Sequence, residues 1–213
     1  VMKTDDLIRA LTSDLGPPGP SIETRFAVAF LPGLLIALVL FAVTLGPRGD
    51  LALVAGDMRF QFKFVVTLLL ALCSALLVWR LVRPGAPARL QIAVLAFVPL
   101  VLAAGVLIEL FVLPAGSWCP KLIGSNGLVC LVSIPFFALP MLIAEILALR
   151  QGAPTRPTLT GVVAGLFAGG VAAAIYAAHC PDDSPLFVAL WYSLGIAIVA
   201  LVGGFAGRLA LRW

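Results

Sequence analysis

Residues 159–180 read LTGVVAGLFAGGVAAAIYAAHC, and no side chain in this run carries a formal charge at neutral pH. A helix rises 1.5 Å per residue, so about 20 apolar residues reach across the roughly 30 Å hydrocarbon core of a bilayer. A helix also pairs its backbone polar groups internally, which lipid requires because it offers no hydrogen-bond partners. This stretch is therefore predicted to be a transmembrane helix.

Five more stretches share this length and character, and the six predicted spans cover residues 26–45, 60–82, 90–113, 127–149, 159–180 and 186–207. The chain is 62% hydrophobic and only 11% charged, whereas soluble domains are about a quarter charged. The runs lack the polar–apolar alternation of membrane barrel strands. We predict an all-α fold, a polytopic six-helix transmembrane bundle over residues 26–213, with a short cytoplasmic N-terminal helix.

Glycines recur at four-residue spacing in the last two spans, at Gly161, Gly165 and Gly169 in one and at Gly203 and Gly207 in the other. Small residues at this spacing allow two helix backbones to approach closely in a membrane. The fifth and sixth spans are therefore expected to pack against each other.

The positive charges divide unevenly between the two ends of the spans. One side holds ten of them and the other four: Lys3, Arg9, Arg25, Arg80, Arg83, Arg89, Arg150, Arg156, Arg208 and Arg212, against Arg48, Arg59, Lys63 and Lys121. Cytoplasmic segments carry the excess of Lys and Arg, so both termini are predicted to lie in the cytoplasm. The scattered cations form no basic run, and we expect no direct binding to nucleic acid.

The polar segment 1–25 is the one part of the chain expected to act outside the bilayer, as an arm that ends in a Pro/Gly-rich linker. Acidic residues Asp5 and Asp6 suit the first turn of a helix. One apolar stripe follows, consisting of Leu7, Ile8, Leu11 and Leu15. Helices that lie on membranes are usually basic on the polar face. Docking of this arm into a groove of a protein partner is therefore the favoured interpretation.

Two cysteines are expected at similar depth near the outer side, Cys130 in the fourth span and Cys180 at the end of the fifth. His179, Asp182 and Asp183 add imidazole and carboxylate groups beside Cys180, and these residue types together are typical metal ligands. A structural disulfide between the two cysteines is the alternative.

Of the other two cysteines, Cys119 in the preceding outer loop makes the number of outer cysteines odd, which favours a redox or metal sensor. Cys73 is expected to be a small apolar filler.

Four charged residues fall within or at the ends of the spans. Glu109 is a further metal ligand, a proton acceptor, or an interfacial residue that extends to water. Glu145 is expected to pair with one of three cations near the other side: Arg80, Arg83 or Arg150. Arg59 and Lys63 are expected to extend toward lipid headgroups.

No motif for hydrolysis or group transfer occurs: Gly-x-Ser-x-Gly, a phosphate-binding loop, His-Glu-x-x-His and a nucleotide fingerprint are all missing from the sequence. The chain is therefore not expected to be an enzyme. One alternative is a membrane thiol oxidoreductase that passes electrons from the outer cysteines to a quinone, although no Cys-x-x-Cys pair occurs. Another is a small transporter with Glu109 as its coupling carboxylate.

Over its whole length the chain resembles the NrsF-type bacterial anti-sigma factors, which are six-span inner-membrane proteins. Three segments carry the resemblance: Met2-Lys3-Thr4-Asp5-Asp6-Leu7-Ile8; Gly124-Ser125-Asn126-Gly127-Leu128-Val129-Cys130-Leu131 with Ile134-Pro135; and His179-Cys180-Pro181-Asp182-Asp183-Ser184-Pro185 with Trp191-Tyr192. The last two are the more specific. Cys119 matches no position of the family pattern.

The resemblance implies a location in the bacterial inner membrane and an extracytoplasmic-function sigma factor as the partner, beside membrane lipid. It assigns sigma binding to the arm, whose candidate residues are Asp5, Asp6, Leu7, Ile8, Arg9, Leu11 and Leu15. It also implies that Cys130 and Cys180 sense heavy metals or oxidants. A soft heavy-metal ion would then be a signal and not a permanent cofactor.

Overall fold

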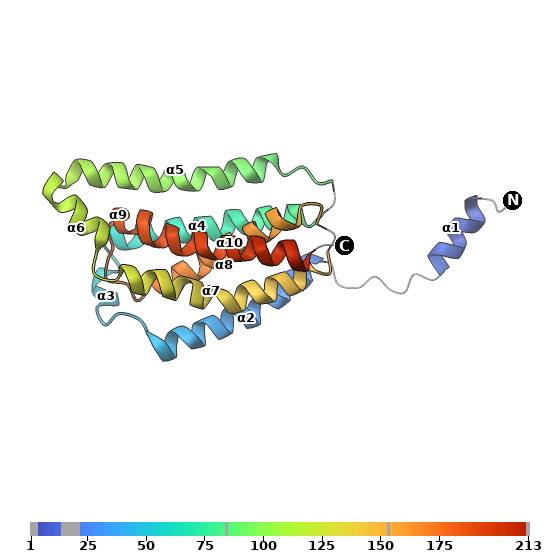
Figure 1. The fold of residues 1–213 in the computed structure, drawn as a ribbon, viewed down its shortest axis with the longest axis horizontal. Coiled ribbons are helices and arrows are strands. Elements are labelled where there is room, and N and C mark those ends of the chain that lie inside the picture. The colour runs from blue at the N-terminus through green and yellow to red at the C-terminus, as the bar shows by residue number, and fades with distance from the viewer. Residues whose placement is uncertain (1–3, 14–21, 84, 153, 212–213) are drawn as a thin grey trace.

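The computed structural model describes residues 4–13, 22–83, 85–152 and 154–211. Within them the chain forms helices and no strands (Figure 1). In chain order the elements are α1 (Thr4–Ser13), α2 (Ile22–Thr44), α3 (Leu51–Val54), α4 (Met58–Leu81), α5 (Arg89–Val112), η1 (Ala115–Ser117), α6 (Trp118–Ile123), α7 (Gly127–Leu149), α8 (Pro157–Ala177), α9 (Pro185–Phe187), η2 (Val188–Tyr192) and α10 (Ser193–Ala210). The predicted all-α class is confirmed.

Six helical segments among these residues are long and apolar enough to cross a membrane: Thr24–Thr44, Met58–Leu81, Arg89–Val112, Gly127–Leu149, Pro157–Ala177 and Pro185–Ala210. The last of these joins α9, η2 and α10 into one helix, and η2 is a π-helical turn. A π turn inside an α-helix is rare and is often found at functional sites. The six-span bundle expected from the sequence is therefore present.

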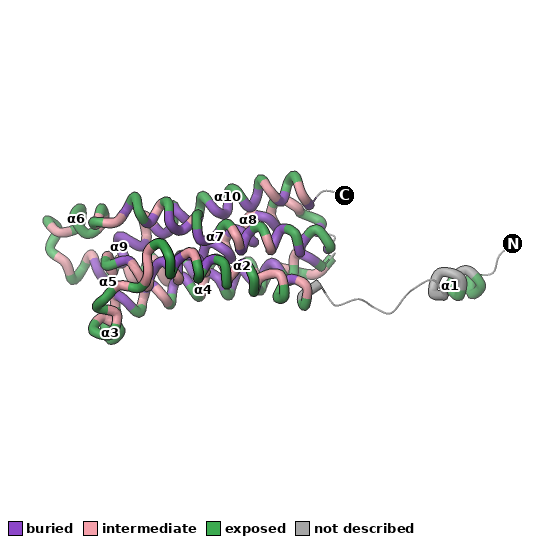
Figure 2. The backbone as a smooth tube through the Cα atoms, turned by 90° about the horizontal axis from the view of Figure 1, so that it is seen from below, coloured by how far each residue is buried: buried purple, intermediate pink, exposed green. Residues whose placement is uncertain are grey.

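The six spans are buried to very different degrees. Within an apolar stretch of 18 residues, 61% of the residues of α8 are buried inside the protein, whereas only 11% of those of α5 are buried. Figure 2 shows the buried positions gathered where α7, α8 and α10 run together. Consequently α8 is the central helix, and α5 is a peripheral helix attached mainly to α4.

The glycine pattern brings α8 and α10 into backbone contact, as expected. A Cβ atom added to Gly161 would lie 2.1 Å from the carbonyl oxygen of Gly203, and one added to Gly203 would lie 2.3 Å from the carbonyl oxygen of Gly161. Neither position has room for a side chain, so the absence of Cβ atoms sets the separation of these helices.

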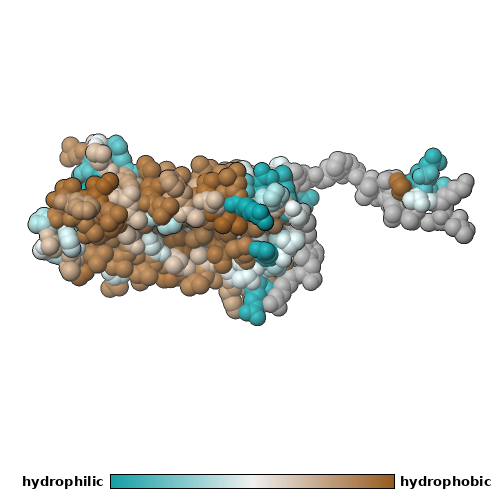
Figure 3. Space-filling view, turned by 90° about the horizontal axis from the view of Figure 1, so that it is seen from above, coloured by the Kyte–Doolittle hydropathy of each residue, from teal (hydrophilic) through white to brown (hydrophobic). Residues whose placement is uncertain are grey.

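The outer surface of the bundle is apolar along its middle and polar toward its ends (Figure 3). Large side chains such as Val43, Phe111 and Leu201 are mostly exposed there, at 80%, 89% and 72%. Exposure of this kind would be costly in water and is favourable in lipid. The end that carries α3, α6 and α9 is called the α6 end below (Figure 1).

Candidate functional site

Two buried thiols lie near the α6 end of the bundle. Cys130 is in the first turn of α7, and Cys180 follows the last turn of α8. Both are completely buried, both belong to the same core cluster, and α7 and α8 are neighbours. Neither forms a disulfide.

Two tyrosines complete the surroundings of the thiols. The rings of Tyr176 and Tyr192 lie 5.8 Å apart, and both tyrosines belong to the same buried cluster as the two cysteines. Their hydroxyl groups have no hydrogen-bond partner within the described part of the chain. The chain has only two tyrosines, and both lie here. Sequence reasoning named Tyr192 only as part of the family resemblance and missed Tyr176, although the position of Tyr176 one helical turn before Cys180 is a usable signal.

The segment 179–184, called the latch loop below, connects α8 to α9 and is tied to several other elements. Nδ1 of His179 lies 2.9 Å from the carbonyl oxygen of Gly46, beyond the end of α2. The carboxylate of Asp182 accepts hydrogen bonds from the backbone N–H groups of Ser125 and Asn126 at 3.1 and 3.0 Å, just before α7. Asp182 therefore anchors the two residues that precede the helix carrying Cys130.

Asp183 is neutralised by two cations from other elements. Its Oδ1 is 2.5 Å from Nζ of Lys63 in α4, and its Oδ2 is 3.0 Å from Nη1 of Arg48. Lys63 also donates a hydrogen bond of 2.7 Å to the carbonyl oxygen of Cys180. The expectation that Lys63 extends to lipid headgroups is wrong: its side chain is completely buried, and its ammonium pairs with the Asp183 carboxylate and the Cys180 carbonyl oxygen instead.

Glu109 of α5 forms an ion pair with α4 and accepts a hydrogen bond from the latch loop. Oε1 of Glu109 lies 3.3 Å from Nε of Arg59, and its Oε2 accepts a hydrogen bond of 3.1 Å from the hydroxyl of Ser184. Glu109 is buried and does not extend to water, which corrects one of its three interpretations. Arg59 is 42% exposed but is held by this pair.

The five predicted metal ligands are not brought together. Cys130 and Cys180 share one buried cluster, whereas His179, Asp182 and Asp183 are engaged by a carbonyl, two N–H groups and two cations. In the described part of the chain, no cluster of three or more His, Cys, Asp or Glu residues is arranged to hold a metal ion. The carboxylates of Asp182 and Asp183 are already bound by N–H groups and cations, so only the two thiols remain as candidate metal ligands.

Three other sequence expectations concern residues away from the latch loop. Glu145 is fully buried in α7, and neither carboxylate oxygen has a hydrogen-bond partner in the described residues, so the expected pairing with a cytoplasmic-side arginine is wrong. Its side chain faces the core, whereas those arginines lie toward the helix ends. Cys119 is exposed on α6. Cys73 packs with Val66 and Val98 as an apolar filler, as expected.

Burial and charge act in opposite directions on the Cys180 thiol. Burial raises its pKa, while a backbone hydrogen bond from Asp182 and the nearby Lys63 ammonium lower it. On the rim of the site, the hydrogen bond from Arg48 holds the pKa of Asp50 below its usual value. The positive charge of Lys63 thus favours the reactive thiolate form of a thiol that burial keeps neutral.

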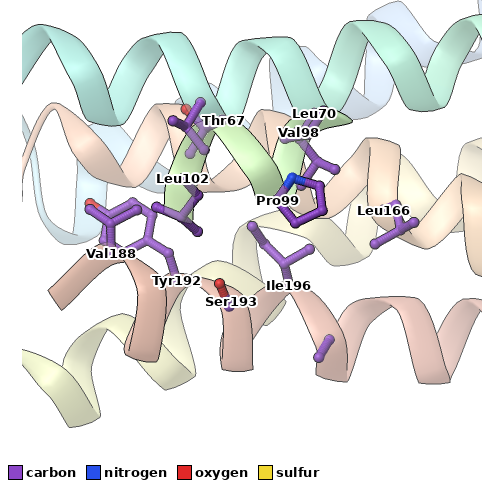
Figure 4. A pocket seen from close by; sticks show the side chains of 12 residues that line it. Thr67, Leu70, Val98, Pro99, Leu102, Leu166, Val188, Tyr192, Ser193 and Ile196 are labelled. Carbon is purple, nitrogen blue, oxygen red and sulfur yellow. The ribbon is translucent and has the colours of Figure 1, made fainter. Parts of the chain in front are cut away.

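A hollow of about 200 Å³ lies on the bilayer side of Tyr192 (Figure 4). Its walls come from α4, α5, α8 and the η2–α10 helix, and include Leu70, Val98, Leu102 and Ile196. They are almost entirely apolar, and Figure 4 shows Tyr192 as part of one wall. Tyr192 therefore belongs both to a wall of this hollow and to the buried cluster that holds the two thiols.

The N-terminal arm forms the helix α1, with Asp5 and Asp6 in its first turn. Asp5, Asp6, Ile8 and Arg9 have exposed side chains. Leu15 and the side chains of Leu7 and Leu11 lie outside the described residues, so the apolar stripe stays a prediction.

The fold and site define a class: a polytopic helical membrane protein with a buried thiol pair at one end and a separate helix at its N-terminus. A family model described as "Negative regulator of sigma F" (NrsF) matches residues 11–213. The chain belongs to the NrsF family, which confirms the resemblance seen in its sequence. It is 40% identical to the Anti-sigma-F factor NrsF of Caulobacter vibrioides and 38% identical to a protein of Azospira oryzae named "Probable anti-sigma-F factor NrsF", each over the full length of both chains. No solved structure matches it.

Proposed function

We propose that this protein is a membrane anti-sigma factor. It holds an extracytoplasmic-function sigma factor through its N-terminal helix and releases it when Cys130 and Cys180 react with a heavy metal or an oxidant. The observation that carries the proposal is the pair of free, buried thiols shared between α7 and the end of α8. The full-length similarity to a protein named as an anti-sigma-F factor supports the choice of partner.

The orientation follows from the excess of Lys and Arg at the end of the bundle where the chain terminates. Both termini then lie in the cytoplasm, where a sigma factor is present. The α6 end, with the thiols and the latch loop, faces the periplasm of the bacterial inner membrane. A signal from outside thus reaches the thiol site without crossing the bilayer.

The sigma-binding element in this proposal is α1. A short helix with acidic residues in its first turn and an apolar stripe suits a groove on a partner protein. The proposed contact residues are those predicted above, from Asp5 to Leu15.

The proposed chemistry joins the two sulfur atoms. An oxidant that accepts two electrons converts the two thiols to one disulfide and releases two protons, and a soft metal ion instead bridges two thiolates. Either bond pulls the start of α7 against the end of α8. Release of the sigma factor then requires that this bond favour one arrangement of the bundle over the other. A preference of about 1.4 kcal/mol changes the ratio of the two arrangements tenfold.

The thiol step is tested by Cys130→Ser and Cys180→Ser in cells that carry a reporter of the sigma factor. Each variant should still co-purify with the sigma factor but should not respond to cadmium or to a thiol oxidant. Cys119→Ser is the matched control, because Cys119 is exposed and lies outside the pair. Normal induction in both Cys130→Ser and Cys180→Ser would remove the sensing step.

The arm is tested separately by deletion of residues 1–15. The shortened protein should reach the membrane and fail to retain the sigma factor, so that the reporter is active without any signal. Continued co-purification of the sigma factor would assign its binding to another part of the chain.

A further inference from the structure

A groove lies between α4 and α5, on the side of the bundle that faces lipid. α5 is fastened to α4 by a small cluster around Val66, Cys73 and Val98. Beside this contact the groove has a volume of about 320 Å³, with walls that include Phe62 of α4 and Val101 and Ile108 of α5. All but two of its lining residues are uncharged.

The two charged residues of the groove are Arg59 and Glu109. The Arg59 side chain is 42% exposed, while that of Glu109 is only 3% exposed. In this ion pair, Nε of the guanidinium lies 3.3 Å from Oε1 of the carboxylate. Oε1 accepts no hydrogen bond from the described residues. The closest approach of the pair is through Nε, and within the described chain the hydrogen bond that the carboxylate accepts comes from Ser184 and not from the terminal nitrogens of Arg59. They are donors that suit an anionic oxygen at the groove mouth.

The dimensions of the groove match one leaflet of a bilayer. Its lining residues on α5 run from Val112 to Val101, a rise of about 16 Å, and half of a 30 Å hydrocarbon core is about 15 Å. A helix with side chains is about 10–12 Å wide, too wide for this volume over that length. An extended hydrocarbon chain is narrow enough.

The groove also points toward the hollow beside Tyr192. Phe62 of the groove is followed one turn later on α4 by Val66 of the hollow, and Val101 is next to Leu102 on α5. A chain that enters at Arg59 therefore runs toward the hollow of Figure 4.

We propose that this groove is a binding site for a phospholipid of the surrounding leaflet. The phosphate accepts hydrogen bonds from Arg59, and one acyl chain lies along Phe62, Val101 and Ile108. Arginine is well suited to phosphate because its planar group presents several donors in a fixed geometry. Such a lipid fills the space that the weak attachment of α5 leaves beside α4. The site is independent of sigma-factor binding.

The test uses the full-length protein in detergent, stripped of lipid, with native mass spectrometry during titration with phosphatidylglycerol. Dioleoylglycerol, which has the same chains without the phosphate, is the comparison probe. A hydrogen bond to a charged group contributes about 1.5–3 kcal/mol, so phosphatidylglycerol should bind at least about tenfold more tightly than dioleoylglycerol. Equal binding of the two lipids would overturn the proposal.

Three variants identify the site. Glu109→Gln should bind phosphatidylglycerol more tightly, because the carboxylate no longer competes for Arg59. The double variant Arg59→Gln/Glu109→Gln, which leaves no unpaired charge buried, should lose the preference for the phosphate. Ala104→Phe fills the groove from an exposed position and should weaken both lipids.

Lys121→Gln, which removes an exposed cation of α6 away from the groove, is the matched control and should bind as the unchanged protein does. Two results would reject the site: an unchanged lipid preference in the double variant, or a dimer that forms through this face in place of lipid binding.

Discussion

Lys63 and Asp183 form an ion pair in which Nζ lies 2.5 Å from Oδ1 and the lysine side chain is completely buried. The lysine comes from α4, and the aspartate belongs to the latch loop that follows Cys180. The same ammonium holds the carbonyl oxygen of Cys180. The position of one of the two thiols is thus set by a charge from a different helix.

Lys63→Met should therefore destabilise the protein strongly. It leaves Asp183 with Arg48 alone and removes the shorter donor to the Cys180 carbonyl. Loss of one member of a buried pair costs about 3–5 kcal/mol, which should appear as a lower unfolding midpoint in detergent. Lys63→Met/Asp183→Asn should recover part of this loss. Additive losses in the double variant would show that the pair is not coupled.

The four cysteines should differ sharply in reactivity. Cys119 is exposed, whereas Cys73, Cys130 and Cys180 are buried. A membrane-impermeant maleimide added to intact cells should label the protein once, and Cys119→Ser should abolish this labelling until the protein is denatured. Rapid labelling of the Cys119→Ser variant in its folded state would mean that a second thiol is open to solvent.

The pH at which Cys180 reacts should depend on Lys63. The thiolate is the reactive form, and a positive charge nearby lowers the pKa of a thiol. Burial raises the pKa of Cys180 and Lys63 opposes this shift. Replacement of Lys63 by Met should consequently move the rise of the alkylation rate to higher pH. The measurement is a rate–pH profile with Cys119 and Cys130 changed to Ser, and a shift to lower pH would contradict the role of the ammonium.

Asp182→Ala should loosen the start of α7. The carboxylate accepts hydrogen bonds from the N–H groups of Ser125 and Asn126, and loss of a hydrogen bond of this kind costs about 0.5–1.5 kcal/mol. Hydrogen exchange at residues 125–128 should accelerate, less so in Asp182→Asn, which keeps an acceptor. Asp57→Ala removes the N-cap of α4 and is the control, since it should leave exchange at these residues unchanged.

Gly161→Ala should separate α8 from α10. The added methyl would lie 2.1 Å from a carbonyl oxygen of the facing backbone, and overpacking of a tight core costs about 1–3 kcal/mol or more. The unfolding midpoint should fall. Gly56→Ala, where no atom lies within 4 Å of the new carbon, should not lower it. Equal stability of the two variants would show that the helices relax without cost.

Local sequence patterns predicted the helices of the bundle and one of their contacts, but not the positions of its buried charged side chains. The glycine spacing correctly predicted that α8 and α10 pack together, because four-residue periodicity places the glycines on one helix face. The length of each apolar run predicted a span, because bilayer thickness sets that length. The same reasoning expected Lys63 to extend to lipid headgroups and Glu145 to pair with an arginine, and it left three interpretations open for Glu109.

What the sequence by itself determined is the class of fold and the distribution of charge, since both depend on local composition against the fixed dimensions of a bilayer. Only the tertiary structure decided which groups meet. Lys63 pairs with Asp183, which is 120 positions away in the chain. The ring of Tyr176 contacts the ring of Tyr192, which belongs to a different helix. Glu145 finds no partner within the described residues. These outcomes depend on which helices are neighbours and how each is rotated, and no local pattern encodes that rotation for a helix that is apolar on every face.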